Sequence, residues 1–126
     1  MNPGAAAEAK RTDAIEAVVQ RISRRWPRED QDRVQGFVRS YYAGVAPEDL
    51  VPREPADLYG AALCHWNLGA RRRPGQPNLH VYNPDTERHG WDSTHTIVEI
   101  VTDDMPFLVD SVSMALNRLG LTIHLI

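Results

Sequence analysis

The chain has 126 residues, of which 42% are hydrophobic and 25% are charged, as in an ordinary soluble globular domain. Its formal net charge of −3 does not favour binding to nucleic acid or to an anionic membrane. The sequence has no apolar run long enough to span a membrane and no secretory signal at its start. Its single cysteine, Cys64, excludes an internal disulfide, so we expect a reducing, cytoplasmic location.

The first part of the chain is predicted to be helical. Residues 1–11 have no hydrophobic periodicity and are expected to form a disordered tail. Helices are predicted over residues 12–26, 28–43 and 55–68, with a single helical turn at 47–50. Their apolar stripes contain Ile15, Val18, Val19, Ile22 and Trp26, then Val34, Phe37, Val38, Tyr41 and Tyr42, then Leu58, Tyr59, Ala62, Leu63 and Trp66. Short helices are marginal alone, so residues 12–70 are expected to fold as one helical segment.

After the turn-rich linker at residues 71–77, the hydrophobic period changes from about 3.6 residues to about 2. Strands are predicted at residues 78–82 and 94–101, which can pair as a hairpin around an irregular loop. A further amphipathic helix is predicted from Pro106, capped by the aspartate before it. Residues 121–126 alternate as another strand, so we expect a β-α-β unit with parallel strands and a right-handed crossover.

The chain stops within the apolar alternating run at residues 121–126, whereas a C-terminus is usually polar. This pattern predicts a truncated chain. One face and one edge of the small sheet would then lie uncovered. We therefore expect aggregation through the edge formed by residues 121–126.

No sequence motif for catalysis is present: the chain lacks a dinucleotide-binding glycine motif, a phosphate loop and a nucleophile elbow. Lys10 is the only lysine among 14 basic residues and lies in the predicted tail, so lysine chemistry is not expected here. The basic run Arg71–Arg73 could contact phosphates. A solvated loop, or a contact with another part of a longer polypeptide, is the favoured interpretation.

The histidines could in principle bind a metal ion together with Cys64. They are His65, His80, His89, His95 and His124. Cys64 and His65 are adjacent on a helix and point about 100° apart, so they cannot chelate one ion together. His80 and His95 could face each other across the hairpin with His124 nearby, but satisfied or solvent-facing histidines are favoured. We therefore predict no metal site and no bound cofactor in this segment.

The most distinctive segment is an acidic turn between a predicted strand and a predicted helix. Its residues are Asp103, Asp104, Met105, Pro106 and Phe107. The free N–H groups at the start of that helix could bind an anionic ligand. The aspartates, with Asp110, could instead cap those amides and repel a carboxylate. Capping is favoured, an interdomain contact is a third interpretation, and residues 103–107 are kept as the candidate ligand-binding residues.

A strand followed by Asp-x-Pro and a Leu-rich helix ending in Gly resembles the start of an ACT domain, a small βαββαβ regulatory module. Residues 103–120 with Ile123-His124-Leu125 are similar to the N-terminal region of the large bacterial NAD-specific glutamate dehydrogenases. Upstream blocks agree in order: Ala56-Asp57-Leu58-Tyr59-Gly60-Ala61 before His65-Trp66, and Val81-Tyr82-Asn83-Pro84 with Gly90-Trp91. The resemblance covers about residues 30–126.

This resemblance implies an α+β fold, with N-terminal amphipathic helices followed by a partial, truncated ACT-like (ferredoxin-like) β-α-β unit over residues 78–126. It implies an NAD-dependent glutamate dehydrogenase, an oxidoreductase that interconverts glutamate and 2-oxoglutarate. In that family the NAD and substrate sites lie far downstream, so no catalytic residue is carried over. The implied role is regulation or assembly, with the rest of the dehydrogenase chain and further copies as partners, and an amino acid as a candidate effector.

One position departs from the resemblance. Amino-acid-binding ACT domains typically have Gly after the Pro of the turn, whereas this chain has Phe107, which argues against an amino acid approaching the backbone there. Two alternatives stay open. One is a free-standing ACT-like amino-acid sensor, motivated by Asp104-Met105-Pro106, and the other is a helical interaction module that uses Arg71–Arg73.

Overall fold

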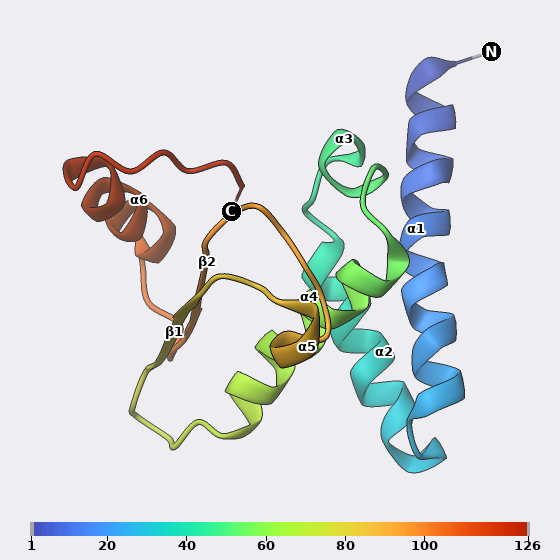
Figure 1. The fold of residues 1–126 in the computed structure, drawn as a ribbon, viewed down its shortest axis with the longest axis horizontal. Coiled ribbons are helices and arrows are strands. Elements are labelled where there is room, and N and C mark those ends of the chain that lie inside the picture. Colours follow the sequence, from blue (N-terminus) through green and yellow to red (C-terminus); the bar gives the residue numbers. More distant parts are fainter. Residues whose placement is uncertain (1, 126) are drawn as a thin grey trace.

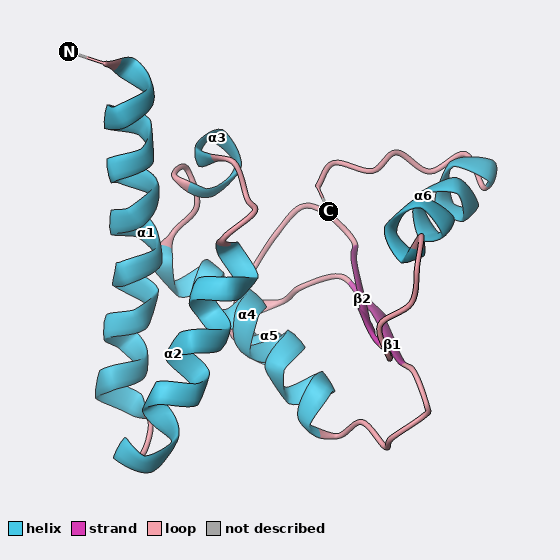
Figure 2. Ribbon diagram, turned by 180° about the vertical axis from the view of Figure 1, so that it is seen from behind, coloured by secondary structure: helices cyan, strands magenta, loops and turns pink. Residues whose placement is uncertain are grey.

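The computed structural model describes residues 2–125 as a helical bundle, a β-hairpin and a C-terminal helix that lies apart from the bundle (Figure 1). The elements are α1 (Pro3–Arg25), α2 (Arg28–Tyr42), α3 (Pro47–Leu50), α4 (Pro55–Ala70), β1 (Asn78–Tyr82), α5 (Thr86–His89), β2 (Ile97–Val101) and α6 (Leu108–Arg118). Figure 2 shows the hairpin between the bundle and α6. This arrangement confirms the predicted α+β class with a partial ACT-like unit. No described helix is both long enough and apolar enough to cross a membrane.

Helix α1 begins at Pro3, so the predicted disordered tail at residues 1–11 is wrong for the residues described; Met1 lies outside them. The Asn2 side chain caps the helix by accepting a hydrogen bond from the Gly4 N–H at 3.0 Å. Arg11 attaches the first turns of α1 to the bundle, because its guanidinium donates to the carbonyls of Tyr42 and Val45 at 2.9 Å each. Alanines and charged residues favour helix without forming an apolar stripe, so periodicity did not detect this segment.

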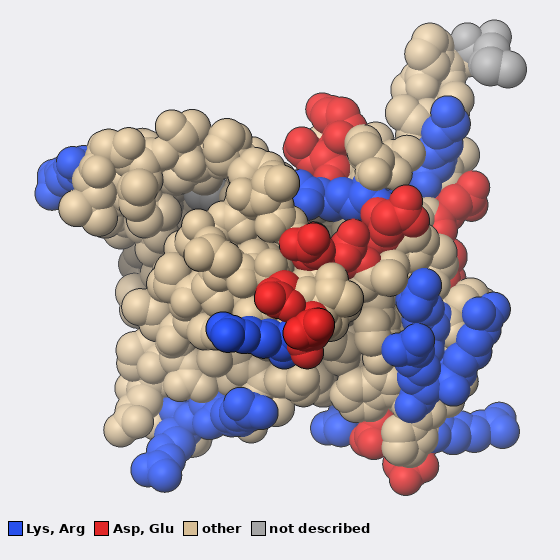
Figure 3. Space-filling view, viewed as in Figure 1, with Lys and Arg blue, Asp and Glu red and all other residues tan. Residues whose placement is uncertain are grey.

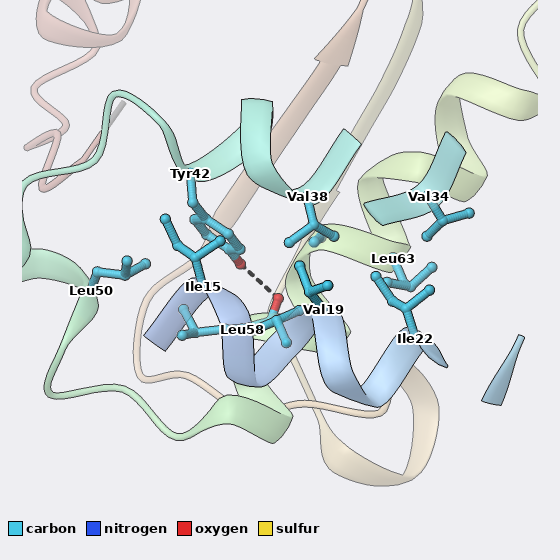
Figure 4. Packing of buried hydrophobic residues seen from close by; sticks show 11 residues of the cluster. Ile15, Val19, Ile22, Val34, Val38, Tyr42, Leu50, Leu58 and Leu63 are labelled. Atoms are coloured by element: carbon cyan, nitrogen blue, oxygen red, sulfur yellow. Dashed lines mark hydrogen bonds between the residues drawn. The ribbon is translucent and has the colours of Figure 1, made fainter. Parts of the chain in front are cut away.

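The core lies between α1, α2, α3 and α4, where the predicted apolar stripes meet (Figure 4). Its buried members are Ile15, Val18, Val19, Ile22, Val34, Val38, Tyr42, Leu50, Leu58, Ala62 and Leu63. The Tyr42 hydroxyl donates a hydrogen bond to the Leu58 carbonyl at 2.6 Å, drawn as the dashed line in Figure 4. This bond satisfies the one polar atom that Tyr42 carries into the core.

Strands β1 and β2 pair in antiparallel register, from Asn78 opposite Val101 to Tyr82 opposite Ile97. The predicted hairpin is therefore confirmed, although β2 begins at Ile97 rather than at residue 94. The loop between the strands contains the single-turn helix α5, which the Asp85 side chain caps. Side chains of the hairpin face α4 on one side, where Val101 lies 3.8 Å from the position that a Gly69 Cβ would take.

The predicted third strand is absent from the described part of the chain. Residues 121–125 form no strand, the sheet has the order β1-β2, and Ile126 lies outside the described residues. The expected parallel β-α-β unit is therefore wrong, although its helix, α6, is confirmed. Gly120 ends α6 with φ 76, and the Leu121 N–H bonds back to the Leu116 carbonyl at 3.2 Å. An alternating pattern forms a strand only when a neighbouring strand supplies backbone partners.

Candidate functional site

The predicted ligand-binding residues, Asp103, Asp104, Met105, Pro106 and Phe107, all lie exposed on the turn between β2 and α6. Neither aspartate caps α6. Phe107 occupies the N-cap position, and no side chain accepts a hydrogen bond from the first amides of the helix. The predicted aspartate cap is wrong, because the helix begins after Phe107 and not at Pro106. Ligand binding by residues 103–107 stays a prediction.

Phe107 adopts a left-handed backbone conformation, with φ 62 and ψ 22. Within the described range it is the one residue other than glycine with a positive φ. This conformation suits glycine and costs other residues about 1–2 kcal/mol. Phe107 is 75% exposed, so packing offsets little of this cost. The position after Pro106 thus has a backbone conformation typical of glycine but carries a phenyl ring.

The basic run in the linker contacts the acidic turn. The Arg72 guanidinium pairs with the Asp103 carboxylate and also donates to the Gln76 carbonyl at 2.9 Å. Arg71 and Arg73 are exposed. Arg72 therefore joins the linker to the turn within this chain, while its two neighbours face solvent.

A buried carboxylate, which the sequence analysis did not single out, lies between the hairpin and α4. Glu99 of β2 is 2% exposed and is the one buried charged residue among those described. The Tyr82 hydroxyl donates to Glu99 Oε2 at 3.2 Å, and His80 Nδ1 lies 3.3 Å from Oε1. Burial of a carboxylate is costly unless hydrogen bonds replace water. The alternation of β2 could have indicated an inward position for Glu99. It could not have indicated that two residues of β1, His80 and Tyr82, would contact the carboxylate.

The surroundings of Glu99 are aromatic and reach α4 and α5. The His80 ring stacks on Tyr82 with centroids 4.4 Å apart, and the Tyr82 ring lies 4.6 Å from that of His89. The Cys64 thiol donates to the His89 carbonyl at 3.5 Å. Burial, supported by the Glu99 charge, raises the pKa of the Tyr82 hydroxyl, and burial likewise raises the pKa of the Cys64 thiol. Both groups are therefore held protonated, as hydrogen-bond donors.

The histidines occupy separate surroundings. His80 faces Glu99 and not His95, whose ring instead lies 4.6 Å from that of His124. His65 Nδ1 is 2.9 Å from the Tyr41 hydroxyl. Between residues 2 and 125, the structure brings no three histidine, cysteine, aspartate or glutamate side chains into an arrangement that could hold a metal ion.

The two faces of the hairpin have reversed polarity, because all of its polar side chains lie on the face toward α4. That face carries Asn78, His80, Tyr82 and Glu99 beside Ile97 and Val101, whereas the opposite face, here called the outer face, carries only aliphatic side chains. The outer face consists of Leu79, Val81, Val98 and Ile100. Leu79, Val81 and Val98 are 66%, 56% and 40% exposed. An aliphatic sheet face in water is typical of an interaction surface.

Helix α6 adds further apolar surface. It buries none of its residues, and Val109 and Met114 within it and Leu119 directly after it are all more than half exposed. An amphipathic helix of this length is marginal alone, and Leu108, Val112 and Leu116 on its apolar stripe are only partly buried, so a further apolar partner would stabilise α6. The outer face and α6 together present the largest set of unpacked aliphatic side chains in this structure.

The helical bundle, the hairpin and the amphipathic α6 define an α+β module with a partial ACT-like unit. The family described as "Glutamate dehydrogenase, ACT1 domain" matches residues 37–126, and the chain belongs to this family. The match begins within α2 and so includes part of the helical bundle as well as the hairpin and α6.

Two curated relatives are both named NAD-specific glutamate dehydrogenase. The protein of Halomonas elongata is 43% identical over 121 residues, which are 96% of this chain and 8% of that protein. The protein of Pseudomonas aeruginosa is 48% identical over 88 residues, which are 70% of this chain and 5% of that protein. The chain thus spans less than a tenth of the length of these relatives. No solved structure matches it.

Proposed function

We propose that this chain is an N-terminal assembly and regulatory segment of an NAD-dependent glutamate dehydrogenase. The oxidation of glutamate to 2-oxoglutarate, ammonia and NADH takes place in a catalytic domain outside the chain, which also binds the NAD. The names of the relatives support the reaction, and the absence of a suitable lysine or glycine-rich motif from the sequence supports a separate catalytic domain. The free thiol of Cys64 supports a reducing compartment such as the cytoplasm.

The observation that carries this proposal is the reversed polarity of the hairpin. Val81 and Val98 lie directly opposite each other on the outer face, and both face solvent. Removing such side chains from water is favourable by about 25 cal/mol per Å² of apolar area, so a partner that covers this face would stabilise the protein. We assign its occupant to the remainder of the dehydrogenase polypeptide, which would pack an apolar surface on the outer face and on α6.

The test uses the full-length enzyme that contains this segment. Val81→Asp places a charge in the proposed interface, and we expect loss of the native assembly in light scattering and a fall in glutamate-dependent NADH formation. Val51→Asp is the matched control, because Val51 is also exposed but lies beyond α3, away from the outer face. Native assembly and full activity of Val81→Asp would overturn the docking role.

A second measurement tests where the chemistry takes place. The 126-residue chain alone, supplied with glutamate and NAD, is expected to form no NADH. Turnover by this chain would contradict the assignment of the catalytic domain to another part of the enzyme.

A further inference from the structure

A pocket of about 290 Å³ lies between the C-terminal half of α1, helix α4 and helix α5, and it borders the core at Leu63. Its polar lining consists of Arg21, Arg25, Tyr59, Cys64, Asn67 and His89. No aspartate or glutamate is among the described residues that line it. The pocket is separate from both the acidic turn and the outer face of the hairpin.

Arg21 and Arg25 bring positive charge to this pocket without an acidic partner. They are four residues apart on α1 and therefore share one face of the helix, where like charges repel. The ion pairs formed by the described residues involve neither of them. The Arg25 guanidinium lies 5.6 Å from the ring centroid of Tyr59, which places it at the pocket wall. Figure 3 shows basic side chains gathered over this end of α1.

Three further side chains of the pocket lining, Tyr59, His89 and Asn67, can act as hydrogen-bond donors. The Tyr59 hydroxyl accepts a bond from Trp26 Nε1 at 3.0 Å, so its own proton is free for a ligand. His89 Nδ1 accepts from the backbone N–H of Asp85 at 3.0 Å, so a neutral His89 carries its proton on Nε2. The Asn67 amide adds two more donor hydrogens.

We propose that this pocket binds a small anion with two negative charges, a dicarboxylate or a phosphate, between the guanidinium groups of Arg21 and Arg25. A planar guanidinium pairs with carboxylate and phosphate oxygens through two parallel hydrogen bonds. An anion here would neutralise the repulsion along α1 and join α1 to α4 and α5. This inference does not rest on the proposed function, because the pocket is formed without the outer face.

The test titrates the 126-residue chain with succinate and, separately, with inorganic phosphate. Binding is followed by calorimetry and by the backbone amide signals of Gly60 and Gly90, which lie in the pocket lining. The double variant Arg21→Gln/Arg25→Gln is expected to lose about tenfold or more in affinity, because two charge-assisted interactions are removed. Glutamine keeps the helix propensity of α1 nearly unchanged.

The matched control is Arg24→Gln/Arg28→Gln, which removes the same charge from the same end of the molecule but from outside the pocket. We expect it to bind nearly as the unaltered chain does. Equal losses in the two double variants would show general electrostatic attraction and overturn the site. Failure of both anions to shift the Gly60 and Gly90 signals would also overturn it. Preference for one anion would assign the ligand to the carboxylate or the phosphate class.

Discussion

Gly60 in α4 lies directly against Trp91, the buried residue that follows α5. A Cβ added to Gly60 would come within 2.5 Å of the Trp91 Cβ, which is closer than real carbon atoms approach. The absence of a side chain at Gly60 therefore allows the hairpin loop to pack on the helical bundle. This contact links the two parts of the fold.

The first prediction follows from this contact. Gly60→Ala should lower the free energy of unfolding by about 1–3 kcal/mol, because overpacking outweighs the better helix propensity of alanine. Gly36→Ala is the matched control, since Gly36 lies within α2 with nothing inside 4 Å of its added Cβ. That variant should gain up to about 1 kcal/mol. Urea unfolding measures both, and equal effects of the two substitutions would contradict the Gly60–Trp91 contact.

The second prediction concerns the buried carboxylate. Tyr82→Phe removes the hydroxyl that donates to Glu99, and we expect a loss of about 1–3 kcal/mol in unfolding free energy. Tyr59→Phe is the control, because the Tyr59 hydroxyl bonds only the neutral Trp26 indole and the ring is less buried. Its loss should be about 1 kcal/mol or less. Chemical denaturation compares the two, and a Tyr82→Phe variant as stable as the parent would show that Glu99 gains nothing from Tyr82.

The third prediction is a loss of stability at alkaline pH. Burial, with the nearby Glu99 charge, raises the pKa of Tyr41 from 10.0 to about 12, and burial raises the pKa values of Tyr42 and Tyr82 as well. Between about pH 10 and pH 12 the folded chain therefore binds more protons than the unfolded chain. The stability that the raised pKa values contribute is fully present below about pH 10. Above that pH the free energy of unfolding decreases, by up to about 1.4 kcal/mol per pH unit for one phenol.

This pH dependence can be measured by urea unfolding from about pH 9 to pH 12, alongside phenolate absorbance of the folded chain. Tyr41→Phe should make the decrease in unfolding free energy less steep. If the absorbance showed all phenols ionising together near pH 10 while the chain stayed folded, the burial of these hydroxyls would be disproved.

The fourth prediction separates the outer face from the core. In the 126-residue chain, Val81→Asp should leave the far-UV circular dichroism and unfolding free energy nearly unchanged and should reduce self-association, because Val81 is exposed. Val38→Asp, which buries a charge in the core, should prevent folding. Light scattering reports the association. Unchanged association of Val81→Asp would indicate that another surface causes it.

The fifth prediction tests the strained turn before α6. Phe107→Gly should stabilise α6 by about 1 kcal/mol relative to Phe107→Ala, because both variants lose the phenyl ring but only glycine adopts a positive φ without cost. Amide hydrogen exchange within α6 gives the local measure. Equal exchange protection in the two variants would show that the left-handed conformation at residue 107 carries no strain.

The sequence of the acidic turn predicted the family of the chain but not the contacts that the turn makes. The residues of the Asp-x-Pro block identified the family, which the match over residues 37–126 shows. They did not indicate that Arg72 would engage Asp103, or that Phe107 would take the N-cap position. Likewise, the alternation of β2 puts Glu99 on one face of a strand but cannot show that this face is buried.

Apolar periodicity and turn residues were enough to predict the helical bundle, the hairpin and α6, because these signals act over a few neighbouring positions. The folded structure was needed to show which hairpin face is buried, that Arg11 holds the start of α1 against the bundle, and that residues 121–125 form no strand. These outcomes depend on contacts between residues far apart along the chain. A hydrogen-bond partner for Glu99, or a strand beside residues 121–125, is a property of neighbours that local pattern does not contain.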